Sequence, residues 1–399
     1  MNKELMKSAV VRNLEWFKRS GVMLPADGSW GVAERVAVAQ NEAIEEMLKA
    51  FPAWTKHDNY YIIEQRRADC CFEAAWYFLE AGRLDAQYRQ IGENILDFLY
   101  FRSGLLNRYD AKYPIGSWNW SHIKWEPTVY FDDNSWCIFI QLAIAKNYPE
   151  LDEKYRCTSW ALSLADELAV AANRTFGQAS ASGNWKDPQA IWRGHYDLPH
   201  WGSLVSLALA SANAVRPRAE YVFEIRRYQE HIAAEARNLI ASEQAYALLA
   251  CSYCAKKLGD SLYTDLAVRL GDLLMEKIDP DTGNLPAEHR ESPVGVHLVD
   301  TIYTMNWAAM ALQGLFELTK SSIVQENLGK MLQLLLKIQD FSTQDSFAGC
   351  WRGMYDLNAK TWGGGDRYEG GSGSIYTGWT NTTIGLTLLW KLSGKSLIS

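Results

Sequence analysis

Two adjacent carboxyl side chains are the clearest chemical feature of this sequence. Asp132 and Asp133 lie in the segment YFDDNSW (130–136), where a predicted apolar helix begins. One aspartate there is explained by capping, because its carboxylate accepts backbone N–H bonds and meets the positive end of the helix dipole; Asp132 suits this role. The second is less easily explained. Like charges close together raise the pKa of one group, as a general acid requires, so Asp133 is the first candidate for a proton donor.

A third carboxyl residue, Asp69, could complete a catalytic pair. It lies in the predicted helix 60–81, with Glu73 one turn further on. Glycoside cleavage commonly uses two carboxyl groups that flank the scissile bond. Asp69 could therefore act with one of the adjacent aspartates. The alternative is an ion pair between Asp69 and Arg66 or Arg67.

Candidate substrate-binding residues centre on a short internal repeat. The segments WRGHYDL (192–198) and WRGMYDL (351–357) each place an arginine beside a tryptophan. Arginine binds carboxylates with paired hydrogen bonds, so these charges in an acidic chain predict an anionic sugar such as a uronic acid. The alternative for each arginine is an ion pair that holds its loop in place. The candidate polar contacts to substrate are Arg193, His195, His200, Glu243, Arg290, His297, Arg352 and Asp366.

Tryptophan is unusually frequent, with 17 residues in the chain. Its large amphipathic ring stacks on the C–H faces of sugars when it lines a cleft. The tryptophans that fall in predicted long loops are Trp118, Trp120, Trp125, Trp185, Trp192, Trp351 and Trp362. We expect Trp118, Trp120 and Trp192 to stack on sugar rings. The alternative is that they pack their loops onto the helices.

The elements that position these residues are helices, because apolar residues recur at helical spacing along most of the chain. One set is charged and has a single apolar stripe: 83–103, 152–174, 219–240, 259–278 and 322–341. A second set is nearly uncharged beyond its first turn and must be buried on all sides: 60–81, 132–147, 197–214, 242–257, 297–319 and 374–393. Two further helices are predicted at 2–19 and 34–50.

Six buried helices, each paired with an outer one, predict an all-α (α/α)6 barrel. One of the first two helices is then extra, and residues 1–399 form a single domain. Long connections join outer to inner helices at 104–131, 175–196, 279–296 and 342–373. Since successive helices are antiparallel, these loops share one end with the N-termini of all inner helices. We expect the functional site at that end.

Composition excludes several classes of protein. The formal charge of −7 (40 Lys and Arg against 47 Asp and Glu) offers no electrostatic footprint for nucleic acid. No apolar stretch is long enough to span a membrane, and the N-terminus lacks the apolar core of a signal peptide. Seven cysteines without such a signal indicate reduced thiols in a cytoplasmic protein. No metal-ligand spacing or phosphate loop occurs, so neither a metal nor a cofactor is predicted.

The sequence resembles the six-hairpin glycosidase superfamily in its helix alternation, in FDDNSW at the start of an inner helix, and in the final GGSGSIYTGWTNTTIGLTLL. The segment DDNSW resembles the paired-aspartate motif of bacterial α-1,6-mannanases, which implies that Asp132 and Asp133 are both catalytic. The chain is also similar to unsaturated glucuronyl and rhamnogalacturonyl hydrolases, whose key aspartates lie near the starts of successive inner helices, as Asp69 and Asp133 would here. That resemblance implies hydration of a vinyl ether. A β-glucuronidase on the same barrel is a related possibility.

We therefore predict a cytoplasmic glycoside hydrolase that acts on a uronic-acid-containing oligosaccharide. Asp133 is the predicted proton donor, with Asp69 or Asp132 as its partner. Three alternatives remain open. They are a sugar epimerase or isomerase with histidine as acid and base, an α-mannanase-like endo-glycosidase, and a non-catalytic carbohydrate-binding protein. The sequence makes no prediction of oligomeric state.

Overall fold

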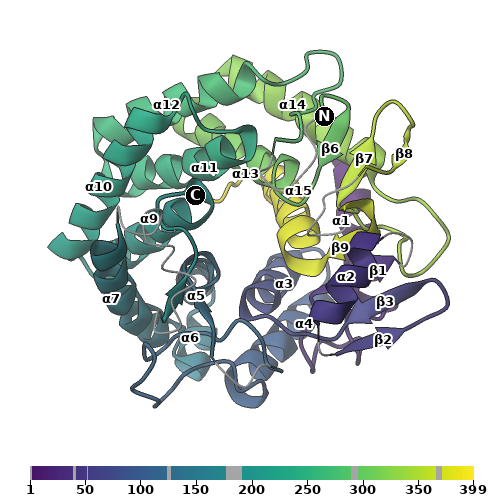
Figure 1. Cartoon of the computed structure of the whole chain (residues 1–399), viewed down its shortest axis with the longest axis horizontal. Helices are drawn as coiled ribbons and strands as arrows, with labels where there is room; N and C mark the ends of the chain where they lie inside the picture. The colour runs from purple at the N-terminus through teal and green to yellow at the C-terminus, as the bar shows by residue number, and fades with distance from the viewer. Residues whose placement is uncertain are drawn as a thin grey trace.

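A ring of six inner helices forms the centre of the protein (Figure 1). The computed structural model describes residues 2–38, 42–51, 53–123, 127–176, 191–288, 295–364 and 371–399. Each inner helix contacts the next, and the last returns to the first. In chain order they are α3 (Ala68–Ala81), α5 (Phe131–Asn147), α9 (Pro199–Val215), α11 (Ala241–Leu258), α13 (Met305–Thr319) and α15 (Thr383–Ser393).

A second layer of helices surrounds this ring, and each member packs against at least one inner helix. They are α1 (Lys3–Arg19), α4 (Ala86–Asp97), α7 (Cys157–Thr175), α10 (Ala219–Glu235), α12 (Ser261–Met275) and α14 (Ser322–Ile338). In α10 the buried residues recur at helical spacing and form one stripe along the helix, as expected of an amphipathic helix. In α11, by contrast, every residue from Ala241 to Ala255 is buried. The predicted (α/α)6 barrel is confirmed.

The sixth outer helix is the first helix of the chain, because α1 packs against α15. The predicted helix 34–50 is wrong in its first half. Residues Arg35–Val38 form strand β1, and only Glu42–Ala50 form a helix, α2. The predicted helix 152–174 is also divided, into α6 (Pro149–Tyr155) and α7, by Arg156 in the left-handed conformation (φ 60°).

Short strands precede the inner helices. A four-stranded antiparallel sheet has the order β2 (Trp54–Lys56), β3 (Tyr60–Ile63), β1 and β9 (Ser374–Tyr376). β4 (Val129–Tyr130) pairs in parallel with β5 (Trp192–Arg193). β6 (Leu298–Asp300), β7 (Met354–Asp356) and β8 (Thr361–Trp362) form a third sheet. The predicted helices 60–81, 297–319 and 374–393 therefore begin too early. Their first residues pair as strands, which satisfies the backbone hydrogen bonds of the loops.

Aromatic side chains from the inner helices fill the axis of the barrel. The rings of Trp136 and Phe139 stack with centroids 5.3 Å apart, and Trp76 lies 4.9 Å from Trp390. All four are buried. Much of the tryptophan content is thus explained by the packed axis, which closes the barrel between its two ends.

All seven cysteines are buried and none is in a disulfide. Across the described residues, no helix combines the length and apolar character needed to cross a membrane.

Candidate active site

The inner helices converge on a small pocket at their N-terminal ends. Every position in the ring contributes at least one side chain, with the last supplied by the π-helical segment Thr377–Thr382 that leads into α15. The volume of the cavity is about 10 Å³, enough for one water molecule, so the side chains pack closely around its centre. The pocket is lined by Asp69, Asp132, Asp133, Trp136, His200, Leu204, Tyr246, Trp307 and Trp379.

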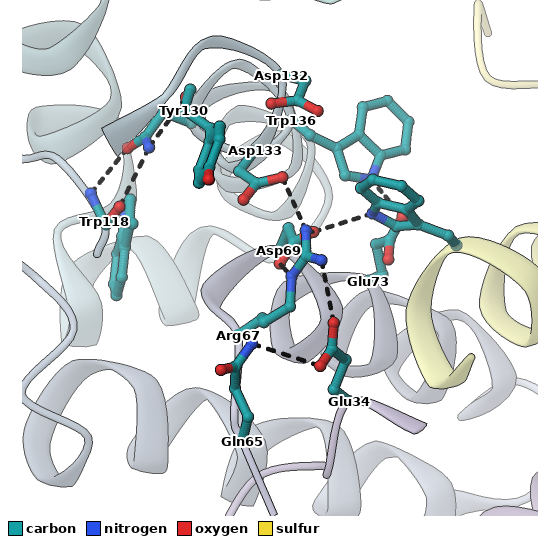
Figure 2. A network of polar contacts seen from close by, with 12 residues as sticks. Glu34, Gln65, Arg67, Asp69, Glu73, Trp118, Tyr130, Asp132, Asp133 and Trp136 are labelled. Atoms are coloured by element: carbon teal, nitrogen blue, oxygen red, sulfur yellow. Dashed lines mark hydrogen bonds and ion pairs between the residues drawn. The ribbon is translucent and has the colours of Figure 1, made fainter. Parts of the chain in front are cut away.

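One side of the pocket is organised by a buried arginine (Figure 2). Arg67 precedes α3 and binds both oxygens of Asp69, at 3.0 Å through Nε and 2.6 Å through Nη2. The same Nη2 lies 2.9 Å from Oδ1 of Asp133, and Nη1 lies 3.2 Å from Glu34. The indole of Trp379 donates a further hydrogen bond of 2.9 Å to Asp69. The expected ion pair of Asp69 is therefore present, and it lies within the pocket.

The environment of Asp133 favours the protonated form of its carboxyl group. Burial raises the pKa of Asp133 well above its ordinary value, and Asp69 and Asp132 raise it further, although Arg67 opposes the shift. A hydrogen bond between the carboxyl groups of Asp133 and Asp69 also raises the pKa. Because both oxygens of Asp69 are occupied by Arg67, Asp69 acts as the acceptor that orients the acid.

Asp132 faces the opposite side of the same pocket and contacts the next inner helix. Its Oδ2 lies 3.2 Å from Nε2 of His200 in the first turn of α9. Its Oδ1 is buried and has no hydrogen-bond partner in the described part of the chain. Capping does not explain Asp132, since α5 has Tyr130 as its N-cap and no side-chain cap bond. One carboxylate oxygen is thus left for a ligand in the pocket.

His200 is fixed by its surroundings. Its backbone N–H donates a hydrogen bond of 2.8 Å to the side chain of Glu243. Glu243, a predicted substrate-binding residue, therefore contacts the backbone of His200. The imidazole centroid lies 4.9 Å from the ring of Tyr246 and 5.7 Å from that of Trp379. The histidine therefore has one defined orientation toward Asp132.

Solved structures share this architecture. With D-mannose isomerase the TM-score is 0.61 at 13% identity, covering 97% of each chain. With a variant of UGL, an unsaturated glucuronyl hydrolase, in a structure with dGlcA-Glc-Rha-Glc, the TM-score is 0.60 at 16% identity over 97% of each chain. With the α-1,6-mannanase GH76A from Salegentibacter sp. HEL1_6 it is 0.56 at 10% identity, covering 96% of this chain and 98% of the mannanase.

The chain has the six-hairpin glycosidase fold. No model of a known protein family matches the sequence, and no curated protein sequence matches it. The six-hairpin glycosidase fold is thus established by the structure, at identities that carry no information on the reaction.

The loop tryptophans that the structure describes do not line the pocket. Trp118 is 1% exposed and packs edge-on against Phe72 at 4.8 Å, so a sugar cannot reach its face. The ring of Trp192 stacks on Phe131 at 5.0 Å. Trp120 alone of the three predicted stacking residues contacts the arginine that organises the pocket, with its ring 5.6 Å from the Arg67 guanidinium. For Trp118 and Trp192 the packing alternative is therefore the correct one.

The predicted cationic residues are also dispersed. Arg352 binds Asp340 at 2.8 Å, which holds its loop in place and does not bring it to the pocket. Arg193 lies in β5, beside Tyr130, and the ring of His195 contacts Trp201. His297 precedes β6, and its backbone carbonyl accepts from Leu357. Arg290, Asp366, Trp125 and Trp185 lie outside the described residues.

Several pocket residues were missed at the sequence level. Trp136, Trp307 and Trp379 lie near the starts of inner helices, and Tyr246 lies in the second turn of α11. Their signal is an aromatic residue early in an otherwise uncharged helix. Beneath them Glu73 accepts from Nε1 of Trp136 at 2.7 Å, and burial raises the pKa of Glu73 well above its ordinary value. No group of three metal-ligating side chains occurs among the residues with described positions.

Proposed function

We propose that this protein is a glycoside hydrolase. The observation that carries the proposal is the placement of two unlike carboxyl groups in one pocket. Asp133 is a buried acid whose pKa is raised, and Asp132 keeps an oxygen without a partner. Hydrolysis of a glycosidic bond commonly needs one carboxyl group that gives a proton and a second that acts at the anomeric carbon.

In the proposed reaction, Asp133 gives its proton to the glycosidic oxygen as the bond to the departing sugar breaks. A water molecule adds its oxygen to the anomeric carbon and gives a proton to Asp132, so a hydroxyl group replaces the departing sugar. Arg67 and Asp69 orient the acid, and His200 orients the second carboxylate. In the structurally similar mannanase, a variant with two consecutive aspartates replaced by asparagine is described as inactive. The adjacent Asp132 and Asp133 support a comparable use here.

For the substrate we propose an oligosaccharide that contains a uronic acid. Arg193 lies in β5, paired with Tyr130 of β4, and His195 follows this strand; they are the described candidates for its carboxylate. Arg67 is already bound by three carboxylates, and Arg352 by Asp340, so neither supports this part of the proposal. If the sugar is 4,5-unsaturated, Asp133 would protonate its vinyl ether and water would add to the resulting cation.

The test is incubation with a panel of saturated uronate disaccharides, 4,5-unsaturated disaccharides and α-1,6-manno-oligosaccharides. Mass spectrometry detects the added water, and loss of ultraviolet absorbance identifies the vinyl-ether route. Cleavage that disappears in Asp133→Asn supports the proposal. Binding without turnover across the panel would favour the carbohydrate-binding alternative.

A sugar isomerase or epimerase is a second candidate, and one observation favours it. His200 reaches the pocket, where its imidazole could move a proton at a sugar carbon next to a carbonyl group. An isomerase conserves the mass of its substrate and incorporates solvent deuterium at that carbon. Mannose, glucose and cellobiose incubated in D₂O distinguish this reaction from hydrolysis.

A further inference from the structure

A second cavity lies at the other end of the barrel. It is lined by residues from the C-terminal halves of α3, α5, α9 and α11, from the last helix α15, and from the segment 395–399. Its volume of about 520 Å³ falls in the range of small-molecule sites. The proposed reaction at the N-terminal ends of the helices does not use it.

The floor of this cavity is aromatic. Trp76, Phe139, Tyr253 and Trp390 come from four different inner helices, and each is at least nine-tenths buried. The centroids of Phe139 and Tyr253 are 5.2 Å apart, and those of Trp76 and Trp390 are 4.9 Å apart. The stacked pair of Phe139 and Trp136 separates this floor from the candidate active site. The two cavities are therefore distinct.

The rim of the cavity carries three lysines. Lys146, Lys257 and Lys395 line it, and none of them forms an ion pair with an aspartate or glutamate that the structure describes. Lys146 donates to the carbonyl oxygen of Ser399 at 3.2 Å. Glu80, which also lines the cavity, is engaged by Arg83 at 3.5 Å.

Lys257 is repelled by Lys146, a second lysine of the cavity. Burial, Lys146 and Lys256 lower the pKa of Lys257, while Glu317 opposes the shift. Lysines near helix C-termini complement the helix dipole, which accounts for Lys146 and Lys257 singly. It does not account for Lys395, which follows α15 and turns back into the same cavity. An anion bound between the three would relieve the repulsion.

We propose that this cavity binds a small anionic sugar, with the sugar ring filling the space above the aromatic floor and a carboxylate or phosphate group between Lys146, Lys257 and Lys395. A cavity of this volume accommodates a monosaccharide, and charge-assisted hydrogen bonds fix its anionic group. The proposal does not depend on the reaction at the other end of the barrel.

The test is a titration of the full chain with D-glucuronate, D-glucose 6-phosphate and neutral D-glucose, followed by tryptophan fluorescence and by calorimetry. Trp76 and Trp390 provide the fluorescent reporters. We expect one or both anions to bind, and D-glucose to bind at least about tenfold more weakly, since each charge-assisted hydrogen bond contributes more than that factor. Affinity should fall as salt concentration rises. Comparing the two anions identifies whether a carboxylate or a phosphate is preferred.

The variants separate this cavity from the active site. The double variant Lys257→Met, Lys395→Met should weaken anion binding at least about tenfold, because methionine keeps the apolar stem and removes the charge. Lys256→Met is the matched control, since Lys256 neighbours Lys257 but pairs with Glu317 outside the cavity. The control should bind as the natural chain does.

Three results would overturn the proposal. They are no anion binding, equal binding of glucose and both anions, and anion binding that survives in the double variant but is lost in His200→Ala. If the double variant fails to fold, the anion affinity of Lys395→Met alone and the salt dependence of binding by the natural chain test the proposal in its place.

Discussion

Replacing Asp133 with asparagine should abolish turnover while leaving the fold intact. In the folded protein the pKa of Asp133 is raised by burial, and its carboxyl group accepts from Arg67 and shares a hydrogen bond with Asp69. Asparagine has the same shape: its oxygen can accept from Arg67 and its amide can donate to Asp69, but it cannot give up a proton. We expect kcat/KM to fall about 10²–10⁴-fold, the usual contribution of a general acid.

Stability should change in the opposite direction. A carboxyl group whose pKa is raised on folding binds more protons in the folded state than in the unfolded state, so it costs stability as the pH rises above its unfolded pKa. Asp133→Asn removes that cost, and its melting temperature at pH 7 should equal or exceed that of the natural chain. At a pH below the ordinary aspartate pKa the difference should vanish.

The assay is turnover of the best substrate in the panel, together with thermal unfolding from pH 3 to pH 8. Asp279→Asn, in an exposed turn away from the pocket, is the matched control for activity. Turnover within about tenfold of the natural rate, in a variant that is folded, would refute the role of Asp133 as proton donor. A melting temperature that drops sharply at pH 7 would refute the neutral state of this carboxyl group.

Three further predictions test the surroundings of the acid. Gly378→Ala would make a Cβ clash with Oε2 of Glu73, so thermal unfolding should show that the free energy of unfolding falls by at least about 1–3 kcal/mol. The control is Gly329→Ala, in an open position within α14, which should be neutral or stabilising. His200→Ala removes the ion-pair partner of the second carboxylate and should lower kcat about 10–100-fold with little change in fold, which steady-state kinetics and circular dichroism can check. Burial raises the pKa of Asp300 to about 6, so the natural chain should lose stability relative to Asp300→Asn as the pH rises from about 4 to about 6; a constant difference in denaturant midpoint would contradict this.

The helix alternation in the sequence was sufficient to predict the barrel, because charge and burial divide the helices into two layers. It could not identify the sixth outer helix. The helix 2–19 is amphipathic like the other outer helices, but its partner, α15, lies at the other end of the chain. The short strands were missed because segments of two to four residues are too short for alternation to show.

The site was predictable only in part, for a similar reason. Asp69, Asp132, Asp133 and His200 each begin an inner helix, so the topology alone brings them together. The loop residues have no such constraint. Arg352 and Trp118 are placed by local partners, Asp340 and Phe72, which no periodic pattern reveals. Sequence position near the start of a buried helix was thus a better guide to the site than residue type in a loop.

The charge balance of the cluster bears on the raised pKa of Asp133. Two buried arginines, Arg35 and Arg67, face three buried carboxyl groups. Glu34 contacts both arginines, at 3.0 Å and 3.2 Å, and Asp69 takes two bonds from Arg67 and one from Trp379. Asp133 has a single contact with an arginine that is already shared. Burial and the neighbouring Asp69 and Asp132 raise the pKa of Asp133, and its single contact with this shared arginine opposes the shift only in part.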